Sequence, residues 1–212
     1  MTRIKICGIT NLADARYASG AGADLLGFIQ YEASARCVDA GLARDIIAWI
    51  HGAESVGVFV DADADDVNAT VAATGFDYVQ LHGSESPAYC SLIEKPVIKA
   101  LRVFPGTSAS EIELAVAAYA DVVDHFLIDT GSSSSAGGTG MPFDWSILEG
   151  VEFPKPWLLA GGLSPNNIDK ALERLEPWGV DVASGVEEKP GQKDFEAIDQ
   201  FVEAVRGQVA NR

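Results

Sequence analysis

The sequence predicts an α/β fold, a single-domain (β/α)8 TIM barrel that spans residues 1–212. Strand-like and helix-like segments alternate eight times, and strict alternation of this kind is typical of a parallel sheet. The 212 residues, divided among eight units, leave about 26 for each, a compact version of this barrel. No linker interrupts the pattern, so a second domain is not expected.

The predicted elements follow one another at regular spacing. We expect strands near 3–7, 24–29, 55–60, 77–81, 97–102, 125–129, 157–160 and 179–183. We expect helices near 11–20, 40–50, 64–73, 86–93, 109–119, 144–149, 166–175 and 194–206. A capping side chain or a first-turn proline supports four helix starts, at Asn11, Ser86-Pro87, Ser108 and Ser164-Pro165. An open doubly wound sheet is the alternative, but no G-x-G-x-x-G pattern follows the first strand.

Composition and charge narrow the class of protein. The chain is 48% hydrophobic and carries a net charge of −16, without a basic stripe that could bind a nucleic acid. The N-terminus lacks the apolar core of a signal peptide, and no apolar run approaches the roughly 18 residues that a membrane span needs. The three cysteines share no metal-type spacing and suggest a reducing compartment. We therefore expect a cytoplasmic protein without a metal, a nucleic acid or a membrane; a high-salt habitat stays open.

Two titratable side chains stand at predicted strand ends. The segment 3–6 alternates polar and apolar residues, as a half-buried strand does, and Cys7 and Gly8 follow it. Parallel α/β proteins place their chemistry at this edge, so Cys7 is a candidate catalytic thiol, although a buried structural cysteine is the alternative. Asp129 ends an otherwise apolar strand and could act as a general acid, or could bond the turn that follows.

Three more polar residues belong to the same predicted edge. Arg36, after the second strand, could bind a substrate carboxylate, which arginine grips with two hydrogen bonds. His82 and Asp181 could position polar groups of a sugar. Each has a structural alternative: a solvated arginine, a hydrogen-bonded histidine and an aspartate satisfied by nearby amides. The serine- and glycine-rich stretch 130–140 is predicted to be a loop at the catalytic face.

The last two predicted strands both end in small residues. Gly161 and Gly162 follow one strand, and Ser184 and Gly185 follow the other. Small residues let backbone N–H groups approach a ligand, and barrel enzymes commonly bind phosphate after strands 7 and 8. A thiol, a carboxyl and a phosphate site at one edge together suggest proton transfer on a sugar phosphate.

Several segments together resemble the phosphoribosylanthranilate isomerase family of tryptophan biosynthesis. The resemblance covers essentially the whole chain and is most specific in two segments, Lys5-Ile-Cys-Gly-Ile-Thr-Asn11 and Val79-Gln-Leu-His-Gly83. It continues through Gly57-Val-Phe-Val60, Leu127-Ile-Asp-Thr130, Ala160-Gly-Gly-Leu163 and Val180-Asp-Val-Ala-Ser-Gly-Val-Glu187. The fold of this family is a (β/α)8 barrel, in agreement with the pattern of elements.

The resemblance implies an Amadori rearrangement of N-(5-phosphoribosyl)anthranilate to 1-(2-carboxyphenylamino)-1-deoxyribulose 5-phosphate. By the family pattern, Asp129 would be the general acid and Cys7 the general base. Arg36 would bind the anthranilate carboxylate, and Asp181 would lie near the sugar hydroxyls. No metal or cofactor is implied, because the substrate nitrogen acts as the electron sink. The partner is a small phosphorylated substrate, and the chain is either a monomer or a homodimer.

Two loops depart from the family pattern. Residues 30–37 lack the usual proline and lysine and add Glu32, which could pair with Arg36 and compete with the substrate. Met141 stands where a lysine is usual in the loop after strand 6. The histidine-pathway Amadori isomerase is an alternative, but it has an aspartate in place of Cys7. Indole-glycerol-phosphate synthase needs lysines and a glutamate that are missing here, and a catalytically silent phosphate-binding barrel would not need both Cys7 and Asp129.

Overall fold

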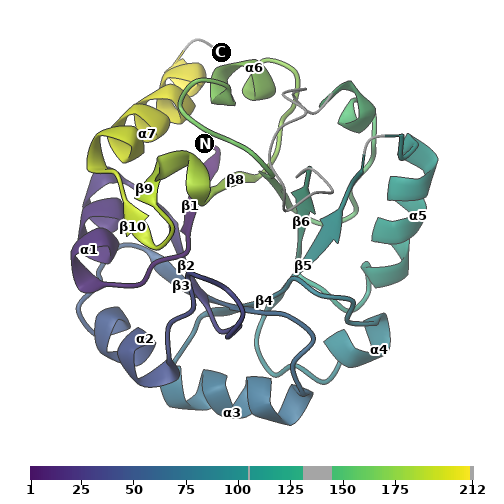
Figure 1. Ribbon diagram of the computed structural model, residues 1–212. Coiled ribbons are helices and arrows are strands. Elements are labelled where there is room, and N and C mark those ends of the chain that lie inside the picture. The colour runs from purple at the N-terminus through teal and green to yellow at the C-terminus, as the bar shows by residue number, and fades with distance from the viewer. Residues whose placement is uncertain (105, 131–144, 211–212) are drawn as a thin grey trace.

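Eight parallel strands close into a barrel in the order of the chain, and the last strand pairs with the first (Figure 1). The structure is a computed structural model that describes residues 1–104, 106–130 and 145–210, with side chains up to residue 207. The strands are β1 (Arg3–Cys7), β2 (Leu25–Ile29), β3 (Glu54–Phe59), β4 (Tyr78–Leu81), β5 (Val97–Arg102), β6 (His125–Asp129), β7 (Trp157–Ala160) and β8 (Gly179–Val182). Each lies within one residue of its predicted bounds.

Helices surround the barrel and cover its outer face (Figure 1). The α-helices are α1 (Leu12–Ala21), α2 (Ala40–Ile47), α3 (Ala64–Thr74), α4 (Pro87–Cys90), α5 (Ala109–Tyr119), α6 (Ile168–Leu172) and α7 (Phe195–Ala210). The side chains of Asn11, Ser86 and Ser108 accept hydrogen bonds from the first turns of α1, α4 and α5, as their sequence positions predict.

Four predicted helices are shorter or tighter than expected. The helix expected at 40–50 ends at Ile47. The helix expected at 86–93 covers only α4, and the one expected at 166–175 covers only α6, because Ser164 starts a turn and not the helix itself. Residues 145–148 of the helix expected at 144–149 form a 3-10 helix, η1 (Trp145–Leu148). Residue 144 and residues 131–140 of the predicted serine-rich loop lie outside the described residues.

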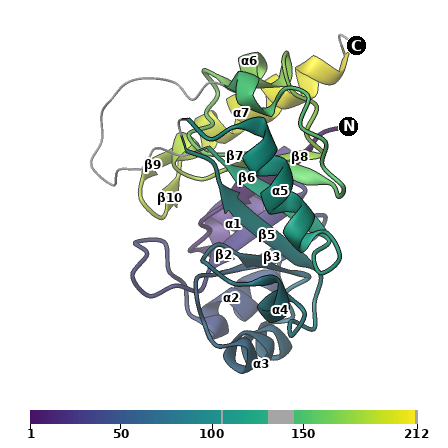
Figure 2. The same ribbon diagram turned by 90° about the vertical axis from the view of Figure 1, so that its right-hand side faces the viewer.

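A short hairpin after β8 was not predicted. It follows the 3-10 helix η2 (Ser184–Val186) and consists of β9 (Glu187–Lys189) and β10 (Gln192–Lys193), which pair antiparallel. Figure 2 shows the hairpin projecting from the same side of the barrel as the loop between β2 and α2. The chain thus adds an extra wall to the face on which the strands end.

Two apolar layers hold the barrel together. The larger layer packs between the strands and the helices, and it includes Ile4 and Ile6 of β1. The smaller layer fills the inside of the barrel, with Cys7, Leu25, Val56, Val58, Ile98, Ala100, Leu127, Leu158 and Ala160. Strand β1 is therefore buried on both faces, and the expectation of a half-buried strand was wrong. Its polar residue Lys5 is fully buried. No helix among the described residues has the length and hydropathy to cross a membrane.

Candidate active site

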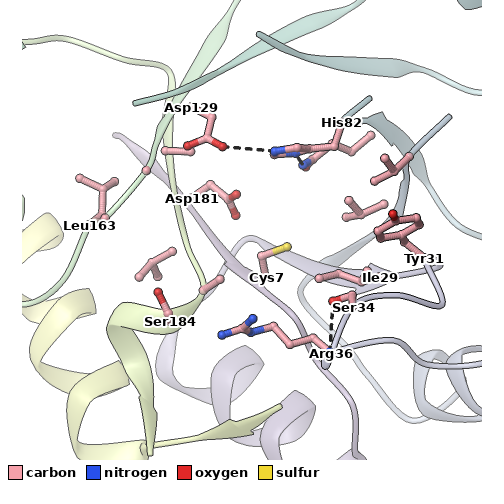
Figure 3. A pocket seen from close by; sticks show the side chains of 18 residues that line it. Cys7, Ile29, Tyr31, Ser34, Arg36, His82, Asp129, Leu163, Asp181 and Ser184 are labelled. Carbon is pink, nitrogen blue, oxygen red and sulfur yellow. Dashed lines mark hydrogen bonds and ion pairs between the residues drawn. The ribbon is translucent and has the colours of Figure 1, made fainter. Parts of the chain in front are cut away.

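A cavity of about 280 Å³ opens at the carboxyl ends of the strands (Figure 3). It collects side chains from distant parts of the sequence, because parallel strands in a closed barrel all end at the same rim. The predicted site residues that line it are Cys7, Arg36, His82, Asp129, Gly161, Gly162, Asp181 and Ser184. Gly185 is the one predicted site residue that does not line it.

Cys7 ends β1 and points its sulfur into this cavity (Figure 3). The thiol is buried, with 6% of the residue exposed. Its neighbour on β2 is Gly27, where a Cβ atom would lie 2.7 Å from the Cys7 sulfur. A glycine is therefore required here for the thiol to fit. Burial raises the pKa of Cys7, and the Lys5 ammonium acts in the opposite direction without cancelling the effect of burial.

Lys5 and Asp181 form a buried ion pair directly beneath the thiol. They are register partners on β1 and β8, and the Lys5 ammonium donates to Asp181 Oδ1 at 2.8 Å. The lysine side chain is fully buried and the aspartate side chain is 9% exposed. Burial opposes the charge of Lys5, but Asp181 and then Cys7 outweigh it and raise the pKa of Lys5. Asp181 therefore contacts a protein cation as well as lining the cavity.

Asp129 ends β6 and faces His82 across the cavity (Figure 3). Their side chains meet at 3.3 Å between Asp129 Oδ2 and His82 Nε2. The other ring nitrogen of His82 lies 2.8 Å from Gln80 Nε2, so this arrangement places the ring proton on Nε2, toward Asp129. Gln80 Oε1 is buried without a hydrogen-bond partner among the described residues. His82 is thus held between a buried amide and the candidate acid.

Arg36 is anchored to Glu187, which overturns the expectation that Glu32 pairs with it. Arg36 Nε donates to both Glu187 oxygens at 2.9 and 3.0 Å, and its Nη2 donates to Oε2 at 2.6 Å. Glu187 belongs to the hairpin, and its side chain is 3% exposed whereas Glu32 is exposed. A fixed, buried carboxylate is a better partner than a solvated one, because it needs no ordering. Arg36 Nη1 has no partner among the described residues.

Lys193 completes this second group of charges. Its buried ammonium donates to the backbone oxygens of Cys7 at 2.6 Å and Ala183 at 3.1 Å, and to Glu187 Oε1 at 2.9 Å. Burial opposes ionisation of Glu187, but hydrogen bonds from Arg36 and Lys193 outweigh it and lower the pKa of Glu187. The hairpin thereby fixes the end of β1 and the loop after β8 in one position.

The glycine-ended loops after β7 and β8 meet at the rim. Gly161 and Gly162 have φ angles of 94° and 67°, a left-handed backbone that favours glycine. Among the residues that the structure describes, a Cβ at Gly162 would meet nothing within 4 Å, so the backbone angle and not a clash with them requires glycine there. Gly185 packs against the backbone of Leu163, and this contact leaves no room for a side chain. Its role in the structure is to let the two loops approach.

The model of the family described as N-(5'-phosphoribosyl)anthranilate (PRA) isomerase matches residues 4–204. The chain belongs to the PRA isomerase family. A curated N-(5'-phosphoribosyl)anthranilate isomerase from Geobacter sp. (strain M21) is 46% identical over 204 residues, which cover 95% of this chain and 97% of the relative.

Solved structures of PRA isomerases show the same fold. The crystal structure of the Thermotoga maritima enzyme is 35% identical with a TM-score of 0.87, and the match covers 98% of this chain and 100% of that chain. A second PRA isomerase crystal structure is in complex with reduced 1-(o-carboxyphenylamino)-1-deoxyribulose 5-phosphate. It is 34% identical with a TM-score of 0.85, again over 98% of this chain and 100% of that chain. The predicted (β/α)8 barrel and the predicted family are confirmed.

Four residues of the site were not singled out from the sequence. Lys5 and Gln80 lie inside the two most specific segments of the PRA isomerase pattern, but a strand-like alternation gave no reason to bury them. Glu187 and Lys193 lie in the hairpin, for which Pro190-Gly191 is a turn signal that could have been used. Among the described residues, no three His, Cys, Asp or Glu side chains gather as a metal site would require.

Proposed function

We propose that this chain catalyses the Amadori rearrangement of N-(5'-phosphoribosyl)anthranilate to 1-(2-carboxyphenylamino)-1-deoxyribulose 5-phosphate, a step of tryptophan biosynthesis. The observation that carries the proposal is the pairing of Cys7 and Asp129 in one cavity, where they come from β1 and β6. One group that accepts a proton and one that gives a proton are what an aldose–ketose rearrangement needs. The PRA isomerase complex with a reduced deoxyribulose phosphate supports the choice of substrate.

In the proposed mechanism, Asp129 protonates the furanose ring oxygen and the bond from this oxygen to C1 breaks. The anthranilate nitrogen supplies the electron pair, so that C1 and nitrogen form an iminium ion. The Cys7 thiolate then removes the proton from C2, and the C–H electrons form the C1–C2 double bond of an enolamine. Transfer of the thiol proton to C1 and of the O2 proton to Asp129 gives the ketone and restores both groups.

His82, which Gln80 contacts, could hydrogen-bond with Asp129 in both of its protonation states, the carboxylate and the protonated carboxyl. With Gln80 Nε2 donating to His82 Nδ1, the tautomer that fits carries its proton on Nε2, which faces the carboxylate. Turning the Gln80 amide over would bring its unpaired Oε1 to the ring, where it accepts from Nδ1–H. His82 Nε2 could then accept from the protonated carboxyl. We propose that His82 positions Asp129 in both states, beyond any contact it makes with the substrate.

The rim provides places for the two ends of the substrate. The left-handed backbone at Gly161 and Gly162 leaves the rim open where a phosphate would approach, with Ser184 on the adjacent loop. Arg36 Nη1 is available for the anthranilate carboxylate, since Glu187 accepts from Nε and Nη2. We propose that Asp181 binds a sugar hydroxyl with the oxygen that Lys5 does not use.

The proposal is tested by following the fluorescence of phosphoribosylanthranilate as it is consumed. Cys7→Ser keeps the size of the side chain, but an alcohol is a much weaker acid than a thiol, so turnover should fall roughly 10²- to 10⁴-fold. Cys37→Ser is the matched control, because Cys37 is exposed and does not line the cavity. Equal activity of the two variants would remove Cys7 from the mechanism, and an inactive wild-type chain would favour a silent phosphate-binding barrel.

Asp129→Asn tests the acid in the same assay. Asparagine keeps the shape and can still bond His82, but it cannot give up a proton as an acid. Turnover should collapse while affinity for the product changes only several-fold, because the lost interaction belongs to the transition state. An equal loss of affinity and turnover would show that Asp129 binds the substrate and that the acid lies elsewhere.

A further inference from the structure

We propose that the buried Lys5 ammonium, held in place by Asp181, is a positioning residue that stabilises the thiolate of Cys7. The inference rests on the proposed function, in which Cys7 is the base. It adds a reason why a thiol enclosed by an apolar barrel can carry a negative charge during the reaction. Lys5 acts through Cys7 and is not proposed to touch the substrate.

Geometry places the cation beside the sulfur. Lys5 and Cys7 are two residues apart on β1, so both side chains point into the barrel. A Cβ atom on Gly27 would lie 2.7 Å from the Cys7 sulfur and 3.1 Å from the Lys5 nitrogen. The two groups therefore border the same small space and lie no more than about 6 Å apart. The absence of a side chain at Gly27 lets the ammonium reach the thiol.

Stability alone does not explain a fully buried lysine at this point. A buried ion pair is often no more stabilising than apolar residues of the same volume, because both charges lose their water. The barrel interior around Lys5 is otherwise largely apolar. Asp181 keeps the lysine charged, since their ammonium and carboxylate are 2.8 Å apart. The pair therefore maintains a cation at the one place where the proposed mechanism forms an anion.

Other charges also act on the Cys7 sulfur, and their signs matter. The carboxylate of Asp181, on β8, opposes a thiolate. The ammonium of Lys193, on β10, favours it, and so does the guanidinium of Arg36, in the loop after β2. Lys5 exerts the largest favourable effect of these groups on Cys7. Its removal should therefore be felt more than removal of any other single cation.

The test measures thiolate formation directly. The ultraviolet absorbance of the thiolate is titrated as the difference between each protein and its Cys7→Ser counterpart, which removes the contributions of Cys37 and Cys90. In Lys5→Met the midpoint should rise by roughly 1–3 pH units, the shift that an opposite charge within a few ångströms produces. The rise of kcat/KM with pH should move by the same amount. Lys99→Met is the control, because Lys99 is also buried and paired, but on β5 with Glu85.

A second comparison protects the test against misfolding. Lys5→Met leaves Asp181 buried without its partner, so the same measurement is made between Asp181→Asn and the double variant Lys5→Met/Asp181→Asn. A higher thiol midpoint whenever Lys5 is missing supports the proposal, with a smaller rise in the Asp181→Asn background because Lys5 has there lost the carboxylate that keeps it charged. An unchanged midpoint in folded Lys5→Met overturns it, whatever happens to turnover. If Cys7→Ser keeps full turnover, the proposed base is wrong, while the titration still decides whether Lys5 stabilises the thiolate.

Discussion

Replacing Lys193 by methionine should destabilise the fold as well as disturb the site. The substitution keeps most of the side-chain volume but removes an ammonium that is buried and donates to two backbone oxygens and to Glu187. Each oxygen left without a donor costs about 1–3 kcal/mol. Glu187 keeps its bond to Arg36, which limits the electrostatic part of the loss in stability. We therefore expect a loss of about 3–5 kcal/mol, the range for breaking a buried pair.

For a chain of this size, that loss corresponds to a fall in Tm of roughly 6–20 °C. Thermal and urea unfolding, followed by circular dichroism, measure it. Lys189→Met is the matched control, since Lys189 lies on the partner strand of the same hairpin but is exposed. If both variants lose less than about 1 kcal/mol, the hydrogen bonds of Lys193 do not hold the hairpin to the barrel, and the reasoning fails.

Three further predictions concern the site. Arg36→Met should mainly raise KM, with kcat/KM falling about 10- to 150-fold and kcat nearly unchanged, because the carboxylate is gripped in ground and transition states alike; steady-state kinetics would expose a kcat effect. Inorganic phosphate should compete with substrate. Gly162→Val should weaken this inhibition, because valine does not tolerate the positive φ of this residue and would distort the backbone that lines the cavity. Gly150→Val is the control, since Gly150 also has a positive φ, 82°, but does not line the cavity. Because burial raises the pKa of Cys7, the rise of kcat/KM with pH should have its midpoint above that of an ordinary thiol; a midpoint below it would contradict that environment.

The sequence was sufficient to predict the strands and most of the site residues at the barrel rim. Apolar runs such as 126–128 end at a polar residue, and in a parallel barrel that point is the catalytic edge. Cys7 and Asp129 could therefore be found as strand-end residues and brought to one cavity by the fold alone. Gly161 and Gly162 followed from the same reasoning. The roles of these residues in catalysis stay predictions.

The misses have physical causes. The alternation in 3–6 predicts that Lys5 faces solvent, whereas it is fully buried. A pattern of alternation does not say whether the polar face of a strand meets water or the inside of a barrel. The burial of Lys5 depends on Asp181, which is 176 positions away in the sequence. Glu187 was missed as the partner of Arg36 for the same reason, and Glu32 was chosen because it is near in sequence. Local patterns do not reveal pairs that only tertiary structure creates.

The hydrogen bond from Lys193 to the Cys7 backbone oxygen affects when the site can form during synthesis and folding. It joins residues 186 positions apart, and closing a loop of that length costs about 4–5 kcal/mol in chain entropy before any contact compensates for it. During synthesis Cys7 leaves the ribosome 186 residues before Lys193, its anchor. Until β8 has emerged, β1 lacks the strand that closes the barrel against it, and until the hairpin has emerged, the Cys7 backbone oxygen lacks its lysine. A chain stopped before residue 193 would carry Cys7 and Asp129 without the surroundings that make them a site.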